Sequence, residues 1–160
     1  MTGPETDAAV HLVERIAAAR GHLLRTAERV PADRWETVPP GFSNHVLWNV
    51  AHVVVTLELL TYGRCGLELV VPPALVAQAR KGTSPADWDA PPDRDAVLEL
   101  ATDSTARLAR DIGAGWFTVY EPYDTSAGVR LASLTDALAF DLYHEGLHAG
   151  AIQALARALG

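Results

Sequence analysis

The chain has 160 residues, of which 49% are hydrophobic, so it can form one domain with a sizeable core and is not a disordered protein. Its formal net charge is −7 and it has no run of Lys or Arg. This argues against nucleic acid as a partner, because phosphate binding needs a basic patch. Cys65 is the only cysteine, so no internal disulfide forms and nothing indicates secretion.

The chain also lacks the sequence features of a secreted or membrane protein. Acidic residues occupy its first positions, where a signal peptide carries positive charge. No uninterrupted apolar run reaches the roughly 18 residues that are needed to span a bilayer. We therefore expect a cytoplasmic protein with no membrane partner.

Four segments carry hydrophobic residues at helical spacing. The first ends before Pro31, and the second starts near Ser43 or Asn44, both of which are common N-cap residues. The third opens with acidic residues, which stabilise a helix N-terminus, and Ser133 precedes the fourth. The predicted helices cover about 6–30, 43–62, 93–112 and 134–159.

Two longer connections separate these helices. Residues 66–92 contain five prolines, with a short helix predicted at 73–81. Residues 116–131 are rich in aromatic and β-branched residues, which fits either an irregular loop or a small hairpin. The sequence therefore predicts an all-α fold, a four-helix bundle with two long connections that forms a single domain over 1–160.

The fourth predicted helix carries the sequence His144-Glu145-Gly146-Leu147-His148. At 100° per residue, the two histidines lie on one helical face that is otherwise apolar apart from Asp141. A divalent ion can satisfy one nitrogen on each of two imidazoles spaced i, i+4. We therefore expect both histidines to bind a metal ion in the core of the bundle.

The same five residues also match the H-E-x-x-H motif of zinc proteases, which needs a third ligand downstream. The remaining sequence, AGAIQALARALG, contains no His, Asp or Glu. In the extended form of the motif, Ala151 stands where Gly is required and Ala154 where His is required. A protease is therefore not expected.

A third ligand is available upstream, on the second predicted helix. His52 lies on a plausible core-facing stripe, and neighbouring helices of a bundle can bring it to the pair on the fourth helix. His45 shares this face but lies two turns away, about 10 Å along the axis, so it is a candidate for the pocket rather than for the same ion. Trp48 lies on this face too, as a core residue or as part of the pocket.

Two acidic residues of the fourth helix lie near the histidine pair. Asp141 is a candidate to accept an N–H from a ligand histidine, or to bond elsewhere, for instance to an Arg of the first helix. Glu145 lies toward the edge of the histidine face and is a candidate for substrate contact.

The segments SNHVLWNVAH and HEGLHAGAIQALARALG, with one histidine and a histidine pair, resemble the DinB/YfiT-like metalloenzyme superfamily. The resemblance covers nearly the whole chain. It implies a four-helix bundle, often a homodimer, with zinc or nickel held by His52, His144 and His148. Many members carry Gln where this chain has Ala151.

The resemblance also indicates a class of reaction. Some members are transferases of a low-molecular-weight thiol (mycothiol, bacillithiol or glutathione), and others are isomerases. We therefore expect a metal-dependent enzyme that acts on a small molecule, with thiol transfer as the leading hypothesis. The alternatives are a non-catalytic metal-binding or stress-response bundle and a metal-dependent hydrolase.

Overall fold

The computed structural model describes residues 3–160, apart from the side chain of Pro4. Its main elements are the long helices α1 (Gly3–Ala27), α2 (Val46–Leu60), α4 (Arg94–Gly113) and α5 (Leu134–Leu159). The connections contain the short helix α3 (Pro73–Ala79) and the antiparallel strands β1 (Tyr123–Asp124) and β2 (Arg130–Leu131). Single 3-10 turns occur at η1 (Ala32–Arg34), η2 (Gly63–Cys65) and η3 (Pro85–Asp87).

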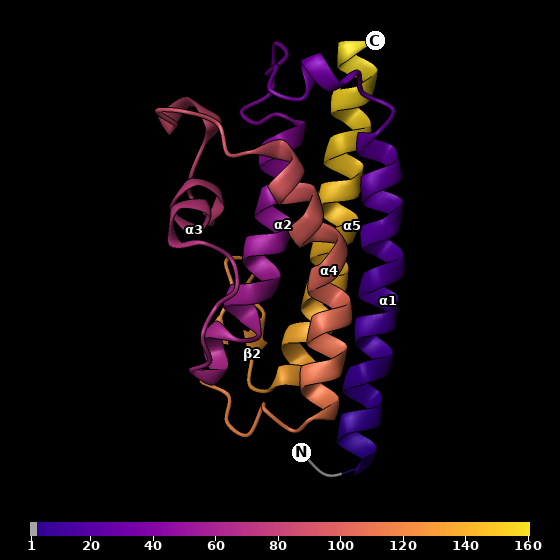
Figure 1. The fold of residues 1–160 in the computed structure, drawn as a ribbon, viewed down its shortest axis with the longest axis vertical. Helices are drawn as coiled ribbons and strands as arrows, with labels where there is room; N and C mark the ends of the chain where they lie inside the picture. The colour runs from indigo at the N-terminus through magenta and orange to yellow at the C-terminus, as the bar shows by residue number, and fades with distance from the viewer. Residues whose placement is uncertain (1–2) are drawn as a thin grey trace.

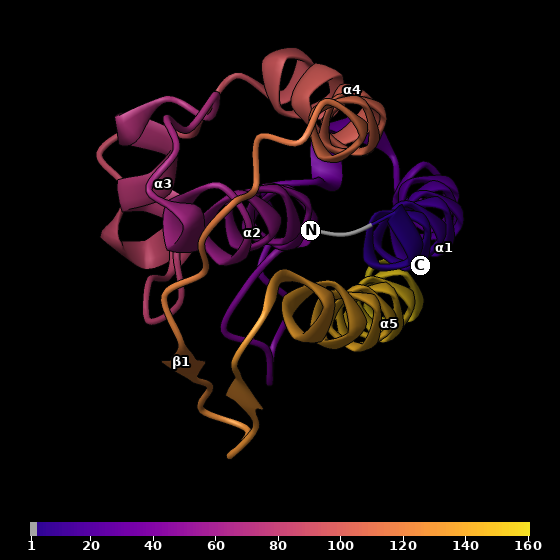
Figure 2. The same ribbon diagram turned by 90° about the horizontal axis from the view of Figure 1, so that it is seen from below.

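The long helices form a four-helix bundle, which confirms the predicted all-α fold. Helix α1 packs against α5 and α4, and α2 packs against the same two helices from the opposite side. Figure 1 shows α1 and α5 running in one direction and α2 and α4 in the other. The connection from α2 to α4 therefore returns along the length of the bundle, and it carries α3 on the outside of α2 (Figure 2).

The helix N-termini depend on side chains that accept backbone N–H groups. Asp93 accepts from Asp95 and Ala96 at the start of α4, and Ser133 accepts from Asp136 at the start of α5. The predicted start of α2 near Ser43 or Asn44 is wrong, because the helix begins later, at Val46. His45 is its N-cap, with an extended backbone and Nδ1 accepting from the Trp48 N–H.

The two long connections differ in how well the sequence predicted them. The short helix is present but ends at Ala79, before the predicted residue 81. Residues 116–131 contain a hairpin, in which Tyr123 pairs with Leu131 and Asp124 with Arg130. Its turn closes through a Thr125 N–H to Val129 O bond of 2.9 Å, with Gly128 at a φ of 76°.

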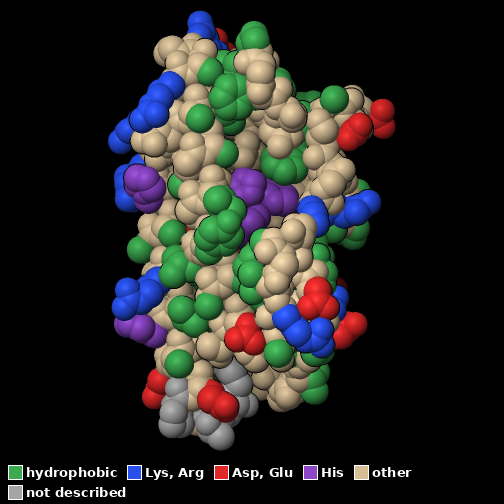
Figure 3. All heavy atoms as spheres, turned by 180° about the vertical axis from the view of Figure 1, so that it is seen from behind, with side chains coloured by type: hydrophobic (Ala, Val, Ile, Leu, Met, Phe, Trp, Pro, Cys, Tyr) green, Lys and Arg blue, Asp and Glu red, His purple; other side chains and the backbone are tan. Residues whose placement is uncertain are grey.

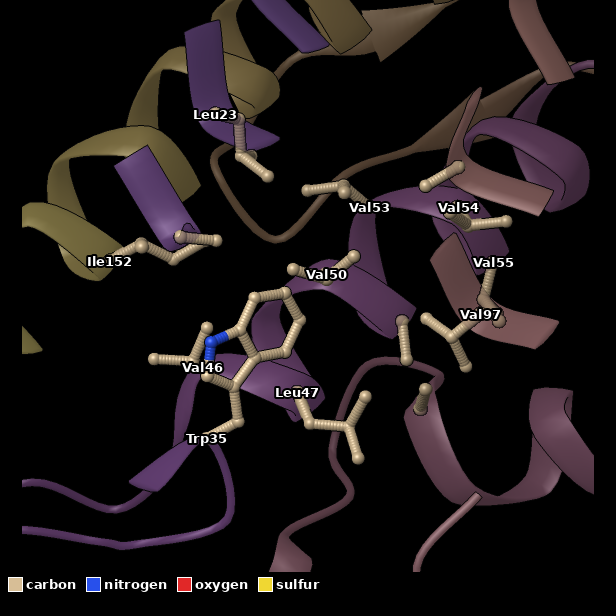
Figure 4. Close-up of a cluster of buried hydrophobic side chains, with 14 of the residues drawn as sticks. Leu23, Trp35, Val46, Leu47, Val50, Val53, Val54, Val55, Val97 and Ile152 are labelled. Atoms are coloured by element: carbon tan, nitrogen blue, oxygen red, sulfur yellow. The ribbon is translucent and has the colours of Figure 1, made fainter. Parts of the chain in front are cut away.

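The largest hydrophobic cluster surrounds the valine-rich helix α2 (Figure 4). Composition alone would allow the segment Val46–Cys65 to cross a membrane, contrary to the expectation from uninterrupted apolar runs. However, 83% of its most apolar stretch is buried inside the bundle. This burial on all sides explains the composition, because a helix enclosed by other elements has no polar face.

A buried ion pair connects the four long helices at the centre of the bundle. Arg20 of α1 donates to the carboxylate of Glu145 on α5, with Nε–O distances of 2.8 and 3.0 Å. Its other nitrogens donate to Val53 O on α2 and to Ala101 O and the Ser104 hydroxyl on α4. Because every charge in this network has a partner, the pair can lie in the core without an isolated buried charge.

Candidate metal centre

Three histidine side chains from two helices converge at one point of the bundle. His52 comes from α2, and His144 and His148 come from successive turns of α5. The Nε2 atom of His144 lies 3.2 Å from Nε2 of His52 and 3.1 Å from Nε2 of His148. All three nitrogens lie within 4.8 Å of one another, so each can offer one ligand atom to a single ion.

Two of these rings are held by hydrogen bonds at their far nitrogens. His52 Nδ1 lies 2.6 Å from Ala79 O at the end of α3, and His148 Nδ1 lies 2.8 Å from Asn49 Oδ1 on α2. Both acceptors are oxygens, so each Nδ1 carries the proton and each Nε2 presents a lone pair to the cluster. Both lone pairs face Nε2 of His144, and a cation at this point would satisfy the lone pairs of His52 and His148 together.

The third ring faces a buried carboxyl group. His144 Nδ1 lies 4.0 Å from Asp141 Oδ1, and neither atom has a hydrogen-bond partner. Burial raises the pKa of Asp141 well above its usual range; the Glu145 carboxylate raises it further, and the Arg20 guanidinium opposes both effects. The alternative of a bond to an α1 arginine does not occur, because Arg20 pairs with Glu145 instead.

The histidines of the cluster are neutral at physiological pH. Burial is the main cause, and it lowers the pKa of His144 to about 2 and that of His148 to about 3; the other rings of the cluster act in the same direction. Burial also lowers the pKa of His52, against the effect of its bond to Ala79 O. A neutral imidazole is the form that binds metal ions, so no proton has to leave before an ion binds.

A cavity of about 440 Å³ opens beside two of the three histidines. His52 and His144 form part of its wall, together with Thr56, Leu59 and Phe140. Figure 3 shows histidine side chains near the middle of one face, with hydrophobic side chains and Lys or Arg side chains next to them. A small molecule in this cavity can therefore reach the histidine cluster directly.

Trp48 packs against His52, one of the three histidines of the cluster. Its ring stacks on His52 with centroids 4.5 Å apart and planes 10° apart, and its Nε1 donates to the Thr83 hydroxyl at 3.2 Å. It does not line the cavity, whereas Phe140 does.

Two of the predicted pocket residues lie away from this cavity. His45 caps α2 and contacts the Trp88 ring at a centroid distance of 5.1 Å, beside a different hollow. Glu145 points into the bundle toward Arg20 and is completely buried. The helical angle between Glu145 and the histidines turns its side chain to α1, so it is not a candidate for substrate contact.

Asn49 was missed by the sequence reasoning, and so was the carbonyl of Ala79. Asn49 is 3% exposed, and it also donates to His45 O at 2.9 Å, which fixes its amide toward His148. The signal available in the sequence was an Asn on an apolar helix, three residues before a candidate ligand. A backbone carbonyl such as that of Ala79 leaves no signal in a sequence.

Comparison with known proteins gives a match to one family. The sequence profile of the DinB superfamily matches residues 15–152, which include the three histidines and most of the bundle. Comparison with curated proteins gives no match. Since the matched range covers well over half of the sequence, the chain belongs to the DinB superfamily.

Proposed function

We propose that this protein is a metal-dependent enzyme that transfers a low-molecular-weight thiol to a small electrophile. The observation that carries the proposal is the convergence of the Nε2 atoms of His52, His144 and His148 beside an open cavity. Three histidine ligands with room for a further ligand are typical of catalytic rather than structural sites. The chain is also a DinB superfamily member, and the resemblance described above implies thiol transfer for some members.

The residues around the cluster fit a divalent ion such as zinc or nickel. The three ligands would be neutral, so the ion would keep its positive charge. Such an ion lowers the pKa of a thiol or water that binds it, so that a nucleophile is available at neutral pH. Ala79 O and Asn49 would keep two of the rings in the ligand orientation, and the Trp48 ring would hold His52 in place.

A reacting thiol would have to come from a small molecule rather than from the protein. Cys65 is the only cysteine of the chain, and it is buried in a hydrophobic cluster. Burial raises the pKa of its thiol to about 11, which leaves almost no thiolate at pH 7. The cavity beside the histidines has room for a small substrate, and its wall includes the apolar side chains of Leu59 and Phe140.

The first experiment is metal analysis of protein that has been purified without a nickel column. We expect close to one equivalent of a divalent metal in the wild type and almost none in the His144→Ala/His148→Ala variant. A matched variant, His11→Ala/His22→Ala, removes two exposed histidines of α1 and should leave the metal content unchanged. Equally low metal in wild type and the cluster variant, after incubation with zinc or nickel, would sink the proposal.

The second experiment asks whether the loaded protein turns over. Metal-loaded and metal-free protein are mixed with mycothiol, bacillithiol or glutathione and a generic aromatic electrophile, and the thioether product is measured. We expect a metal-dependent rate with at least one thiol. A metal-loaded protein with no rate above the control would favour the non-catalytic metal-binding bundle, and ester hydrolysis without thiol would favour a hydrolase.

A further inference from the structure

We propose that the cavity beside the three histidines binds an organic anion, with its carboxylate held by Arg64 and Lys81 and its apolar body on Leu59, Leu60 and Phe140. This inference deepens the proposed function by naming a class of substrate. It rests on that function for the reaction, whereas the binding itself needs only the cavity and its charges. The two can therefore be tested separately.

The charges on the cavity wall differ from those of the protein as a whole. The chain has a net charge of −7, yet the wall contains the cations Arg64 and Lys81 and no carboxylate. The other polar side chains of the wall carry hydroxyls or imidazole rings: Thr56, Tyr123, Thr125, Ser126, His52 and His144. A wall of this composition attracts an anion and offers a cationic substrate no partner.

Arg64 is fixed in place by contacts that leave part of its guanidinium available. Its Nε donates to Glu121 O at 3.0 Å and its Nη2 to Pro122 O at 2.8 Å, and the group lies 5.1 Å from the centre of the Tyr123 ring. The Glu121 carboxylate is 3.5 Å from Nη2, but it is 74% exposed and neutralises little of the charge. Nη1 has no partner among residues 3–160, so it can donate to a ligand.

Lys81 is the only lysine in a chain that otherwise uses arginine for its positive charge. It forms no ion pair in the described part of the chain, and it lies on the cavity wall two residues after Ala79. The Ala79 carbonyl accepts from His52, so the backbone that carries Lys81 is tied to the metal centre. A ligand held by this ammonium group would therefore share the cavity with His52 and His144.

The apolar part of the wall indicates that the uncharged part of the ligand is apolar. Leu59 and Leu60 come from the end of α2, and Phe140 comes from α5, where its ring lies nearly parallel to that of His144. A volume of about 440 Å³ is within the range of small-molecule sites. The cavity therefore suits an amphipathic anion whose charged end faces Arg64 and Lys81.

The test compares three ligands that differ only in the charge of one end. Binding of 4-phenylbutyrate, 4-phenylbutan-1-ol and 4-phenylbutylamine is measured by calorimetry at pH 7.5 with metal-free protein, so that coordination of the carboxylate to a metal does not contribute. We expect the carboxylate to bind about tenfold or more tightly than the alcohol, and the amine to bind most weakly. Equal affinity for the three ligands, or no detectable binding of the carboxylate, would overturn the proposal even if the wild type binds metal.

Variants then test whether the two cations cause the preference for the carboxylate over the alcohol. Arg64→Met/Lys81→Met removes both charges, and it should bind the carboxylate and the alcohol with similar affinity. Arg157→Met is the matched control, because it removes one exposed positive charge near the end of α5, outside the cavity. Lys81→Arg should keep most of the preference. The single variant Lys81→Met removes one charge, as Arg157→Met does. An equal loss of the preference in these two variants would attribute the effect to net charge and contradict the proposed site.

A chemical measurement needs no variant. Lys81 and the N-terminal amine are the only primary amines that the sequence provides. Reductive methylation is followed by mass spectrometry with and without 4-phenylbutyrate, and the N-terminal amine is the internal reference. We expect the ligand to slow modification of Lys81 by severalfold and to leave the reference unchanged. Equal rates at Lys81 under saturating ligand would exclude it from the binding site.

Discussion

Single residues decide how the candidate metal centre is held. His52 and His148 each donate from Nδ1 to an oxygen, and both oxygens are supplied by elements other than the histidine's own helix. Such partners fix the tautomer and the orientation of a ligand, so they affect metal affinity without touching the ion. Asn49 is the side chain through which this effect can be measured, because the other partner is a backbone carbonyl.

Asn49→Ala is expected to weaken zinc binding about 10- to 100-fold, the usual cost of losing such a partner of a ligand. Affinity is measured by competition with a chromophoric chelator. Asn44→Ala, the same substitution just ahead of α2, is the matched control and should leave the affinity within error. If both variants bind zinc as the wild type does, Asn49 does not orient His148 for metal binding.

At the scale of the elements, the Arg20–Glu145 pair joins α1 and α5 and bonds to α2 and α4 as well. Glu145→Ala would leave the Arg20 guanidinium buried without its carboxylate. We expect the free energy of unfolding to fall by about 3–5 kcal/mol in urea denaturation. The double variant Arg20→Met/Glu145→Leu should recover most of this loss, because it leaves no unpaired charge.

The control for the ion pair is an exposed pair of the same kind. Asp124 and Arg130 lie 3.0 Å apart at the hairpin, with more than half of each side chain exposed. Asp124→Ala should therefore change the free energy of unfolding by less than about 1 kcal/mol. A Glu145→Ala variant that is as stable as the wild type but inactive would mean that Glu145 serves the reaction, as in a zinc protease.

The start of α2 makes part of the stability depend on pH. Burial lowers the pKa of His45 from 6.5 to about 4 in the folded protein. Between these two pH values the unfolded chain binds a proton at His45 that the folded chain does not. The contribution of His45 to the free energy of unfolding is therefore fully present above about pH 6.5 and is lost as the pH decreases. The slope from this one group reaches about 1.4 kcal/mol per pH unit.

His45→Asn keeps a side chain that can accept from the N–H groups of the first turn but does not titrate. In metal-free protein, urea denaturation at pH 7 and pH 5 should show a smaller loss of stability for this variant than for the wild type. His22→Asn, at an exposed position of α1, is the control and should lose as much as the wild type. An unchanged loss in His45→Asn would show that the cap does not contribute to the pH dependence.

At the scale of the whole molecule, the candidate metal centre joins α2 to α5, two helices that are far apart in the sequence. An ion bound there would stabilise the folded state alone, because the unfolded chain does not hold the three histidines together. At a free zinc concentration about 100 times the Kd, the expected gain is about 2.7 kcal/mol. The melting temperature should rise on adding zinc and fall back on adding a chelator.

The His144→Ala/His148→Ala variant is the control for this stabilisation. Its melting temperature should not respond to zinc, whereas that of His11→Ala/His22→Ala should respond as the wild type does. An equal response of all three proteins would place the zinc effect elsewhere on the molecule. Hydrogen exchange can then localise it, because a metal at the proposed centre should slow exchange in the turns of α2 and α5 that carry the histidines.

The sequence by itself determined the elements and the face on which the histidines lie. Helical periodicity is local, so it predicted the four long helices, with α5 at Leu134–Leu159, and it put His144 and His148 on one face. Helix ends were less certain, because they depend on individual caps such as His45, whose side chain is rarely an N-cap. The choice between loop and hairpin for 116–131 also needed the structure, since pairing joins residues that lack a strong turn sequence.

Only the tertiary structure decided what surrounds those histidines. Glu145 sits between the two ligands in the sequence, yet it pairs with Arg20, which is 125 residues away. Asn49 meets His148 across 99 residues. Arg64 and Lys81 line one cavity although one precedes α3 and the other follows it in the connection from α2 to α4. Local propensity has no information about such contacts, because they follow from how the helices pack and from the need of each buried charge and polar group for a partner.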